Sequence, residues 1–344
     1  MLSFAEWPLS INAAIFAVAA ALVWGAGSRL AGYVSGIAEK TGLGQAFTGM
    51  LLLGGITSLA EIATVTTSSL SGNPALALNN LLGSASINVL LLAVADAVLG
   101  RDALTKVAAK PATLFQGTLG IMLLAAVAVA VTVGDVALWH VGLGSMVLFA
   151  LCVASLKLSA HYEHRHVWQV LDEDKEGEED EPEKDTPLRA LVIKTAIAAG
   201  VILVAGFFLA QSGDALAQQT GLGSSLAGLV LVGFATSLPE LSSIVAALRL
   251  KRYQLAVGDI FGTNLFNIAL ILLADVTYLE GPILNEAGPF EAVAALLALA
   301  MTGIFVLGLL ERENKTVLRM GYDSLAAILV FAGGLALLYP LAPQ

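Results

Sequence analysis

The chain has 344 residues, of which 57% are hydrophobic and only 13% are charged, and its mean hydropathy is +0.84. This composition excludes a soluble globular protein and indicates a protein of the lipid bilayer. The formal net charge of −10 is unevenly spread, because ten acidic residues fall within Asp172–Asp185. The charge therefore describes one loop and not the whole surface.

Ten apolar stretches are long enough to cross a bilayer as helices of about 20 residues. They lie near 11–36, 44–70, 76–98, 112–133, 138–160, 187–212, 222–249, 254–276, 288–310 and 319–340. The N-terminal MLSFAEWPLS lacks the basic stretch and cleavage site of a signal peptide, so we expect the first span to be retained. Cys152, the single cysteine, lies in the fifth span, where we expect a small packing residue. The predicted fold class is an all-α integral membrane protein with ten transmembrane helices.

An acidic linker at 161–186 separates the fifth span from the sixth. It is too hydrophilic to bury and is interpreted as a solvated connection, although clustered carboxylates also attract Ca²⁺. The residues His161, Glu163, His164 and His166 lack the spacing typical of a zinc site, and we interpret them as residues of the membrane interface.

An internal duplication dominates the rest of the chain. Residues Thr41–Asp96 reappear without a gap as Thr220–Asp275, and about a third of the positions are identical. Both copies begin with TGLG and contain G-x-x-T-S-L-x-E. Both also keep polar groups in an otherwise apolar stretch, namely Glu61, Asn88, Glu240 and Asn267. A duplicated unit that keeps a carboxylate in hydrocarbon is typical of an ion-transport site at a repeat interface.

The basic residues indicate how the chain is oriented. If successive loops lie on alternate sides of the membrane, every Lys and Arg falls on one side or at its membrane edge. These residues are Arg29, Lys40, Arg101, Lys106, Lys110, those from Lys157 to Lys194, Arg249, Lys251, Arg252, Arg312, Lys315 and Arg319. The opposite side carries no Lys or Arg and holds the acidic residues Glu6, Asp135, Asp214, Glu280 and Glu286. By the positive-inside bias, the basic side, with the acidic linker, is cytoplasmic and both termini face outward.

The number of spans between the two copies predicts that they are inverted relative to each other. Five spans, an odd number, separate them, so the second copy points the opposite way through the membrane. We expect one five-helix repeat at 1–160, with its motif at 41–96, and another at 187–344, with its motif at 220–275. Such inverted repeats can rock between inward-open and outward-open forms.

The polar residues of both copies are suited to binding a hard cation. A Glu at mid-membrane depth costs on the order of 2.5–3.5 kcal/mol when unpaired, so it needs a cation or a proton. Ser, Thr and Asn side chains add neutral oxygens, and glycines permit helix breaks that free carbonyl groups. Ca²⁺ and Na⁺ prefer such oxygen shells, whereas zinc and copper favour thiolate or imidazole ligands. Any single Ser or Thr has the alternative of bonding to its own helix at i−4.

Three other acidic residues lie in or beside the duplicated segments. Asp96 and Asp275 lie at the ends of the third and eighth spans and are interpreted as interfacial caps. Asp259 lies opposite Asn80 of the first copy, about one turn before Thr263. It is a candidate third titratable group near the pathway.

The motifs G-x-x-T-S-L-A/P-E and G-S/T-x-x-x-N resemble the two alpha-repeats of the cation/calcium antiporter superfamily, in its sodium/calcium exchanger branch. The resemblance implies a secondary antiporter with ion sites formed by spans 2, 3, 7 and 8. The implied ligands are Gly54 (carbonyl), Thr57, Ser58, Glu61, Ser84 and Asn88, and Gly233 (carbonyl), Thr236, Ser237, Glu240, Thr263 and Asn267.

The chain also departs from the family pattern at two positions. Ala60 stands where the family usually has Pro, as at Pro239, which predicts a weaker helix break in the first copy. Some members carry Asp at the position of Asn267, so the central site here has a formal charge of −2 rather than −3.

We therefore expect an inner-membrane antiporter of a prokaryote that exports Ca²⁺ against Na⁺ or H⁺, with Glu61 and Glu240 binding the competing ions alternately. An exchanger of Na⁺, K⁺ or Mg²⁺ and a cation channel are the open alternatives. The spans contain no HExxH, Ser/His pair or GxGD motif, so an enzyme is not expected. The expected partners are the lipid bilayer and inorganic cations, with no cofactor, no nucleic acid and no obligate protein partner.

Overall fold

The computed structural model describes residues 4–43, 45–99, 102–163, 186–220, 226–313, 315–317 and 319–341. Almost all of the acidic linker, together with Arg101, His164, His166 and most of the second TGLG, lies outside these ranges. Within them the chain is predominantly helical, with two short hairpins.

The elements of the two halves follow one another in the same order. The first half contains η1(Phe4–Glu6), α1(Leu9–Thr41), α2(Gln45–Thr48), η2(Gly49–Leu53), α3(Gly54–Thr57), α4(Leu59–Leu70), α5(Pro74–Leu99), α6(Leu104–Val107), α7(Pro111–Val133), β1(Ala137–Leu138), β2(Val141–Gly142) and α8(Leu143–Glu163). The second contains α9(Leu188–Thr220), η3(Ala227–Val232), α11(Gly233–Thr236), α12(Leu238–Arg249), α13(Tyr253–Thr277), η4(Ile283–Glu286), α14(Pro289–Glu311), β3(Thr316–Val317), β4(Met320–Gly321), α15(Tyr322–Leu338) and η5(Tyr339–Leu341). The helices α9, α12, α13 and α15 begin at the positions related to α1, α4, α5 and α8 by the offset of the duplication. The duplication therefore includes the positions at which helices begin, and it extends beyond the motif segments 41–96 and 220–275.

In the described part of the chain, eight helices are long and apolar enough to cross a membrane. Two further helix pairs pass the same test together but are bent, and counting each pair as one span raises the total to ten. Each of the ten apolar stretches in the sequence corresponds to one of these helices or bent pairs. The chain is thus a helical integral membrane protein with eight to ten spans.

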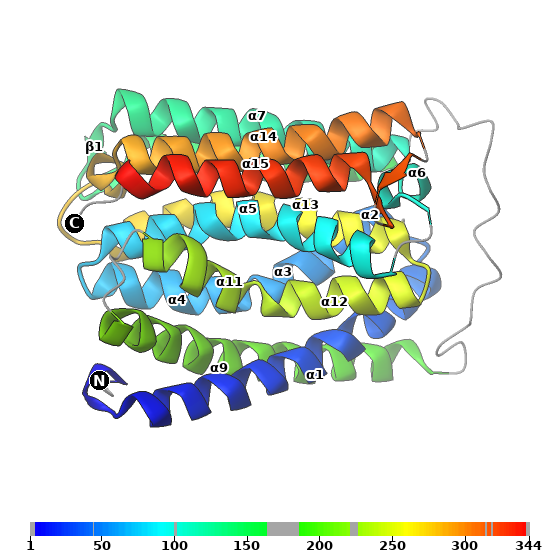
Figure 1. Ribbon diagram of the computed structural model, residues 1–344, viewed down its shortest axis with the longest axis horizontal. Helices are drawn as coiled ribbons and strands as arrows, with labels where there is room; N and C mark the ends of the chain where they lie inside the picture. Colours follow the sequence, from blue (N-terminus) through cyan, green and yellow to red (C-terminus); the bar gives the residue numbers. More distant parts are fainter. Residues whose placement is uncertain are drawn as a thin grey trace.

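The helices form layers around a buried centre (Figure 1). The helices α7, α14 and α15 lie on one side, α1 and α9 lie together on the other, and α5 and α13 run through the middle with the bent pairs. The central position of α5 and α13 agrees with their burial, since 89% and 78% of their most apolar stretches are buried, against 17% for α1. In Figure 1, α1 and α9 run in opposite directions. The polar motifs therefore lie on the most deeply enclosed elements.

Both bent pairs break at a serine of the duplicated motif. A π-helical turn, η2 or η3, precedes each break, and the chain then bends by 47° at Ser58 and by 49° at Ser237. The expectation that Ala60 weakens the first break is wrong. Ala60 and Pro239 both lie in the first turn of the new helix, where the backbone N–H has no intrahelical partner, so a proline is tolerated there without being needed.

Two glycines let the repeats approach each other at the bends. A Cβ atom on Gly83 of α5 would lie 2.3 Å from the carbonyl oxygen of Leu229, and one on Gly262 of α13 would lie 2.2 Å from that of Met50. Both distances are shorter than any real side chain permits, so only glycine fits at either contact. The π-helical turn of each repeat thus packs against the second motif helix of the other repeat.

Asp96 and Asp275 fix loops at the ends of the central helices. Asp96 accepts hydrogen bonds from the backbone N–H groups of Leu104 (2.9 Å) and Gly321 (2.8 Å) and from the Ser324 hydroxyl (2.7 Å). Asp275 has the related partners, namely the N–H groups of Ile283 (2.7 Å) and Gly142 (2.6 Å) and the hydroxyl of Ser145. These contacts agree with the interpretation of both aspartates as caps, and they link each repeat to a hairpin of the other.

Candidate functional site

The first group of oxygen atoms, the Thr57 cluster, consists of Gly54, Thr57, Asp259 and Thr263. The Thr57 hydroxyl lies 3.2 Å from the Gly54 carbonyl oxygen, 3.2 Å from the Thr263 hydroxyl and 3.4 Å from Oδ1 of Asp259. The Thr263 hydroxyl also lies 3.4 Å from the Gly54 carbonyl oxygen. The bend after Thr57 and the helix α13 supply these atoms from opposite repeats.

The second group, the Thr236 cluster, consists of Gly233, Thr236, Ser84 and Asn80. The Thr236 hydroxyl lies 3.2 Å from the Gly233 carbonyl oxygen, 3.2 Å from the Ser84 hydroxyl and 3.2 Å from Oδ1 of Asn80. The Ser84 hydroxyl lies 3.4 Å from the Gly233 carbonyl oxygen. Each atom has its counterpart in the Thr57 cluster at the duplicated position.

The spacing of these oxygens suits a bound cation. Hydroxyl hydrogen bonds are usually about 2.7–2.8 Å long, so contacts of 3.2–3.4 Å are long for hydrogen bonds. Neighbouring oxygens around an ion with metal–oxygen distances of about 2.4 Å lie roughly 3.4 Å apart in octahedral geometry. Both clusters therefore have the oxygen spacing of a partial coordination shell for Na⁺ or Ca²⁺.

Glu61 and Glu240 are fully buried, and none of their four carboxylate oxygens forms a hydrogen bond with the described residues. Glu61 lies near Ser84 and Thr236, Glu240 lies near Thr57, and both glutamates are close enough to Asp259 to interact with it electrostatically. Each glutamate thus lies beside the cluster built on the other repeat's bend. An unpartnered buried carboxylate is costly, which makes both positions suited to a cation or a proton.

The two motif asparagines differ in their contacts. The Asn88 amide donates to Oδ1 of Asn264 (3.1 Å), and Asn264 in turn donates to the Ala85 carbonyl (3.1 Å). The oxygen of Asn88 has no hydrogen-bond partner, and neither amide atom of Asn267 has one within the described ranges. Both oxygens are therefore available as ligands, and Asn267 is the less constrained of the two.

The motif serines also differ. The Ser58 hydroxyl donates to the Gly54 carbonyl of its own helix (2.8 Å), whereas the buried Ser237 hydroxyl has no partner in the described chain. The helix break at Ser58 also places Thr57 and Glu61 on separate helical segments, although the spacing of the motif predicts one continuous face.

Sequence reasoning missed three contributors, namely Asn80, Ser243 and Asn264. Ser243 donates a hydrogen bond to Oδ2 of Asp259, Asn80 completes the Thr236 cluster, and Asn264 positions Asn88. The position-by-position comparison of the copies marks Asn80, because it stands opposite Asp259. Nothing in the periodicity marks Ser243 or Asn264.

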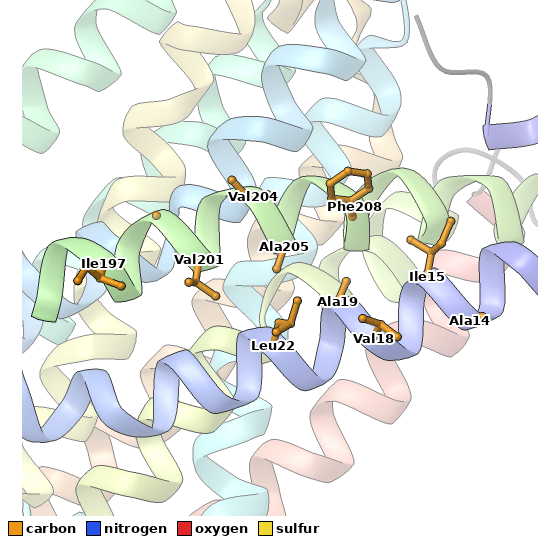
Figure 2. Close-up of a pocket in the computed structure, with 11 residues that line it drawn as sticks. Ala14, Ile15, Val18, Ala19, Leu22, Ile197, Val201, Val204, Ala205 and Phe208 are labelled. Carbon is orange, nitrogen blue, oxygen red and sulfur yellow. The ribbon is translucent and has the colours of Figure 1, made fainter.

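The described residues contain no group of three or more His, Cys, Asp or Glu side chains that converge on one point. Glu61, Glu240 and Asp259 therefore do not form a metal centre of three carboxylates. A separate groove of about 720 Å³ lies between α1 and α9 (Figure 2) and is lined by apolar side chains such as Val18, Leu22, Val201 and Phe208. It offers no side-chain oxygen to a cation, and none of the motif residues lines it.

The chain matches the family model described as sodium/calcium exchanger protein over residues 11–157 and 191–342. Among curated proteins, it is 28% identical over 301 residues to CaxA of Alkalimonas amylolytica, whose name describes it as a candidate antiporter, covering 86% of this chain and 89% of that protein. It is also 28% identical to the inner membrane protein YrbG of Escherichia coli strain K12 over 259 residues, 75% of this chain and 77% of the other. The sodium/calcium exchanger MaX1 of Methanosarcina acetivorans is 28% identical over a shorter region of 138 residues, 39% of this chain and 38% of the other.

A solved structure of the sodium-calcium exchanger NCX_Mj, soaked with Na⁺ and Sr²⁺, has a TM-score of 0.70 to this chain. The sequence identity is 16%, and the match covers 96% of this chain and 99% of that one. At this identity the likeness shows a shared fold.

Proposed function

Because the chain belongs to the sodium/calcium exchanger family, we propose that it is a secondary active antiporter that exports Ca²⁺ in exchange for Na⁺ or H⁺ by alternating access. Glu61 and Glu240 are the shared ligands that bind the competing ions in turn. The protein exposes the occupied site to one side of the membrane at a time, so that transport of one ion drives the other.

One observation carries this proposal, namely the two fully buried glutamates whose oxygens have no hydrogen-bond partner in the described chain. A buried carboxylate is tolerated at such a position only when a counter-charge or a proton neutralises it. Two carboxylates balance one Ca²⁺, two Na⁺ or two H⁺. The site is therefore suited to exchanging one kind of ion for another.

The neutral ligands of the transported ions come from both clusters. The full proposed set is Gly54 (carbonyl), Thr57, Ser58, Glu61, Ser84, Asn88, Gly233 (carbonyl), Thr236, Ser237, Glu240, Thr263 and Asn267. Ca²⁺ takes about 6–8 oxygen ligands at 2.3–2.6 Å, and the 3.2–3.4 Å spacing within each cluster supports this assignment. The names of MaX1 and NCX_Mj, which are sodium/calcium exchangers, favour Na⁺ as the exchanged ion.

The proposal includes an architecture of ten transmembrane helices in two inverted five-helix repeats, at 1–160 and 187–344. The protein lies in the inner membrane with both termini outside and the linker at 161–186 in the cytoplasm. The antiparallel course of α1 and α9 supports the inversion, and the positive-inside bias supports the orientation. The start of α1 and the end of α15 lie at the same end of the bundle, which fits an even number of spans.

Flux through the purified protein in proteoliposomes tests this function. We expect ⁴⁵Ca²⁺ efflux to require Na⁺ or H⁺ on the opposite side, because the empty site does not switch sides and returns only with a counter-ion bound. Separate gradients of Na⁺ and pH identify the driving ion. Efflux that proceeds equally well without any trans cation indicates a channel, and exchange of Na⁺, K⁺ or Mg²⁺ with no ⁴⁵Ca²⁺ flux indicates an exchanger of another cation.

Asn267→Asp is expected to strengthen Ca²⁺ binding by about tenfold, because it adds a negative charge at a buried side chain whose polar atoms have no hydrogen-bond partner in the described chain. The measurement is the Ca²⁺ concentration that half-saturates exchange, with Na⁺ exchange as the second readout. The isosteric substitution Asn12→Asp controls for the effect of any buried charge. Asn12 is buried near the start of α1, and its amide donates a hydrogen bond to the Phe4 carbonyl. Unchanged Ca²⁺ affinity and unchanged ion coupling in Asn267→Asp would place residue 267 outside the ion shell.

A further inference from the structure

The Thr57 and Thr236 clusters are related by the duplication but differ at one position. The Thr57 hydroxyl contacts a carboxylate oxygen of Asp259 at 3.4 Å, whereas the Thr236 hydroxyl contacts the amide oxygen of Asn80 at 3.2 Å. Both contacts place an oxygen at the same point of the cluster. Only the oxygen of Asp259 belongs to a group that can carry a charge.

A second contact holds Asp259 in place. Its other oxygen, Oδ2, accepts a hydrogen bond from the Ser243 hydroxyl of α12. At the related position of α4, the Thr64 hydroxyl bonds back to the Ala60 carbonyl of its own helix (3.0 Å), and the Asn80 nitrogen has no partner in the described chain. The difference between the copies thus involves two residues that act together, Ser243 and Asp259.

None of the Lys and Arg side chains in the described ranges compensates Asp259. It is fully buried, and the hydrogen bonds it accepts come from Ser243 and Thr57. Among the described residues, no Lys or Arg forms an ion pair with it, and the nearly buried Arg252 pairs with Glu39 instead. A buried carboxylate in this setting is suited to a cation that comes from outside.

Asp259 also lies close to the two glutamates. Both Glu240 and Glu61 are near enough to Asp259 to interact with it electrostatically. Asp259 therefore adds a third carboxylate at the Thr57 cluster, whereas Asn80, at the related position of the Thr236 cluster, adds none. The oxygens of Glu240 have no hydrogen-bond partner within the described ranges, so this charge is open to a ligand.

We propose that Asp259 determines ion selectivity, because it adds a third carboxylate at the Thr57 cluster beside the two glutamates that the competing ions share, and so favours a divalent ion. This inference rests on the proposed function, since it names the residue that sets the ion preference of that shared site. The physical reason is that the attraction of a doubly charged ion gains most from a further negative charge in a medium of low dielectric.

A charge-swap series tests the proposal. Asp259→Asn makes the two clusters alike, Asn80→Asp gives both a carboxylate, and the double variant Asn80→Asp/Asp259→Asn moves the charge to the other cluster. Asn at position 259 retains an acceptor for Ser243, and Asn80 already occupies the related position, so the variants are expected to fold. Monodisperse elution and the thermal midpoint without Ca²⁺ check the fold.

The first measurement is the shift in thermal midpoint of the purified protein as Ca²⁺ or Na⁺ is added, which reports binding without transport. We expect Asp259→Asn to raise the Ca²⁺ concentration for half-maximal stabilisation by roughly tenfold or more while shifting the Na⁺ concentration by about threefold or less. The double variant is expected to regain Ca²⁺ binding. Asp259→Asn with Ca²⁺ binding within twofold of the parent protein would overturn the proposal, as would equal losses for Ca²⁺ and Na⁺.

The second measurement is coupled exchange in proteoliposomes. If the parent protein binds Ca²⁺ but does not exchange it, the proposed antiport fails. If the parent protein exchanges Ca²⁺ and Asp259→Asn does so with unchanged Ca²⁺ half-saturation, the antiport stands and the role of Asp259 fails. The two failures are therefore distinguishable.

Discussion

Glu240→Gln is expected to abolish Ca²⁺ transport while the protein remains folded. The glutamate is fully buried and its oxygens have no partner in the described chain, so replacing it removes a charge that only a transported ion compensates. Breaking a buried charge pair costs about 3–5 kcal/mol, which is roughly 10²–10⁴-fold in ion affinity. Without cations the thermal midpoint should stay equal or rise, because the cost of burying an unpaired charge disappears.

The measurement is ⁴⁵Ca²⁺ flux in proteoliposomes, together with the thermal midpoint in ion-free buffer. Glu61→Gln should behave like Glu240→Gln, since the two residues occupy related positions. Glu286→Gln, at an exposed residue of η4, is the matched control and should transport normally. Normal Ca²⁺ transport by Glu240→Gln would remove this residue from the ion site.

Gly262→Ala is expected to have the second-largest effect, on both stability and transport. The new Cβ would lie 2.2 Å from the Met50 carbonyl oxygen and 2.4 Å from its Cα, so α13 and the π-helical turn η2 must move apart. Overpacking of this kind costs about 1–3 kcal/mol. Thr263 follows Gly262 directly, so the shift also separates Thr263 from Thr57 and Gly54, and we expect Ca²⁺ affinity to fall by about tenfold.

Gly83→Ala should have the same consequences at the Thr236 cluster, because its Cβ meets Leu229 in the related contact. Gly303→Ala on α14 is the matched control, since no heavy atom lies within 4 Å of the added Cβ. It should leave transport unchanged and stabilise the helix by up to about 1 kcal/mol, because alanine is the better helix former. Equal thermal midpoints and equal Ca²⁺ half-saturation for Gly262→Ala and the parent protein would contradict the close-packing argument.

Several features of the site were predictable from the sequence for a clear reason. Glu61 and Glu240 stand out because charged residues are rare in apolar stretches, and the duplication identifies them as a pair. Membership in the exchanger family, predicted from the paired motifs, is confirmed by the family match over residues 11–157 and 191–342. The helical class is also confirmed, and each of the ten apolar stretches corresponds to a helix or a bent pair.

Other features were not predictable, because they depend on contacts between distant residues. Thr57 and Thr263 are 206 positions apart, and Thr236 and Asn80 are 156 apart. The periodicity of one helix indicates which residues share its face but not which face of the other repeat it meets. The expectation for Ala60 was wrong because the first break bends by 47° without a proline, close to the 49° of the second break.

The sequence by itself determined that the chain lies in a membrane, that it contains a duplicated unit and that each copy keeps a carboxylate in hydrocarbon. These properties are local, because hydropathy, repetition and residue type can be read without knowing which residues touch. Only the tertiary structure decided that each oxygen cluster combines atoms of both repeats, and that Asp259 lies beside Thr57 and is held by Ser243. The physical reason is that coordination and electrostatics depend on distances in space, which are set here by glycine contacts between two bent helices and their opposite repeats.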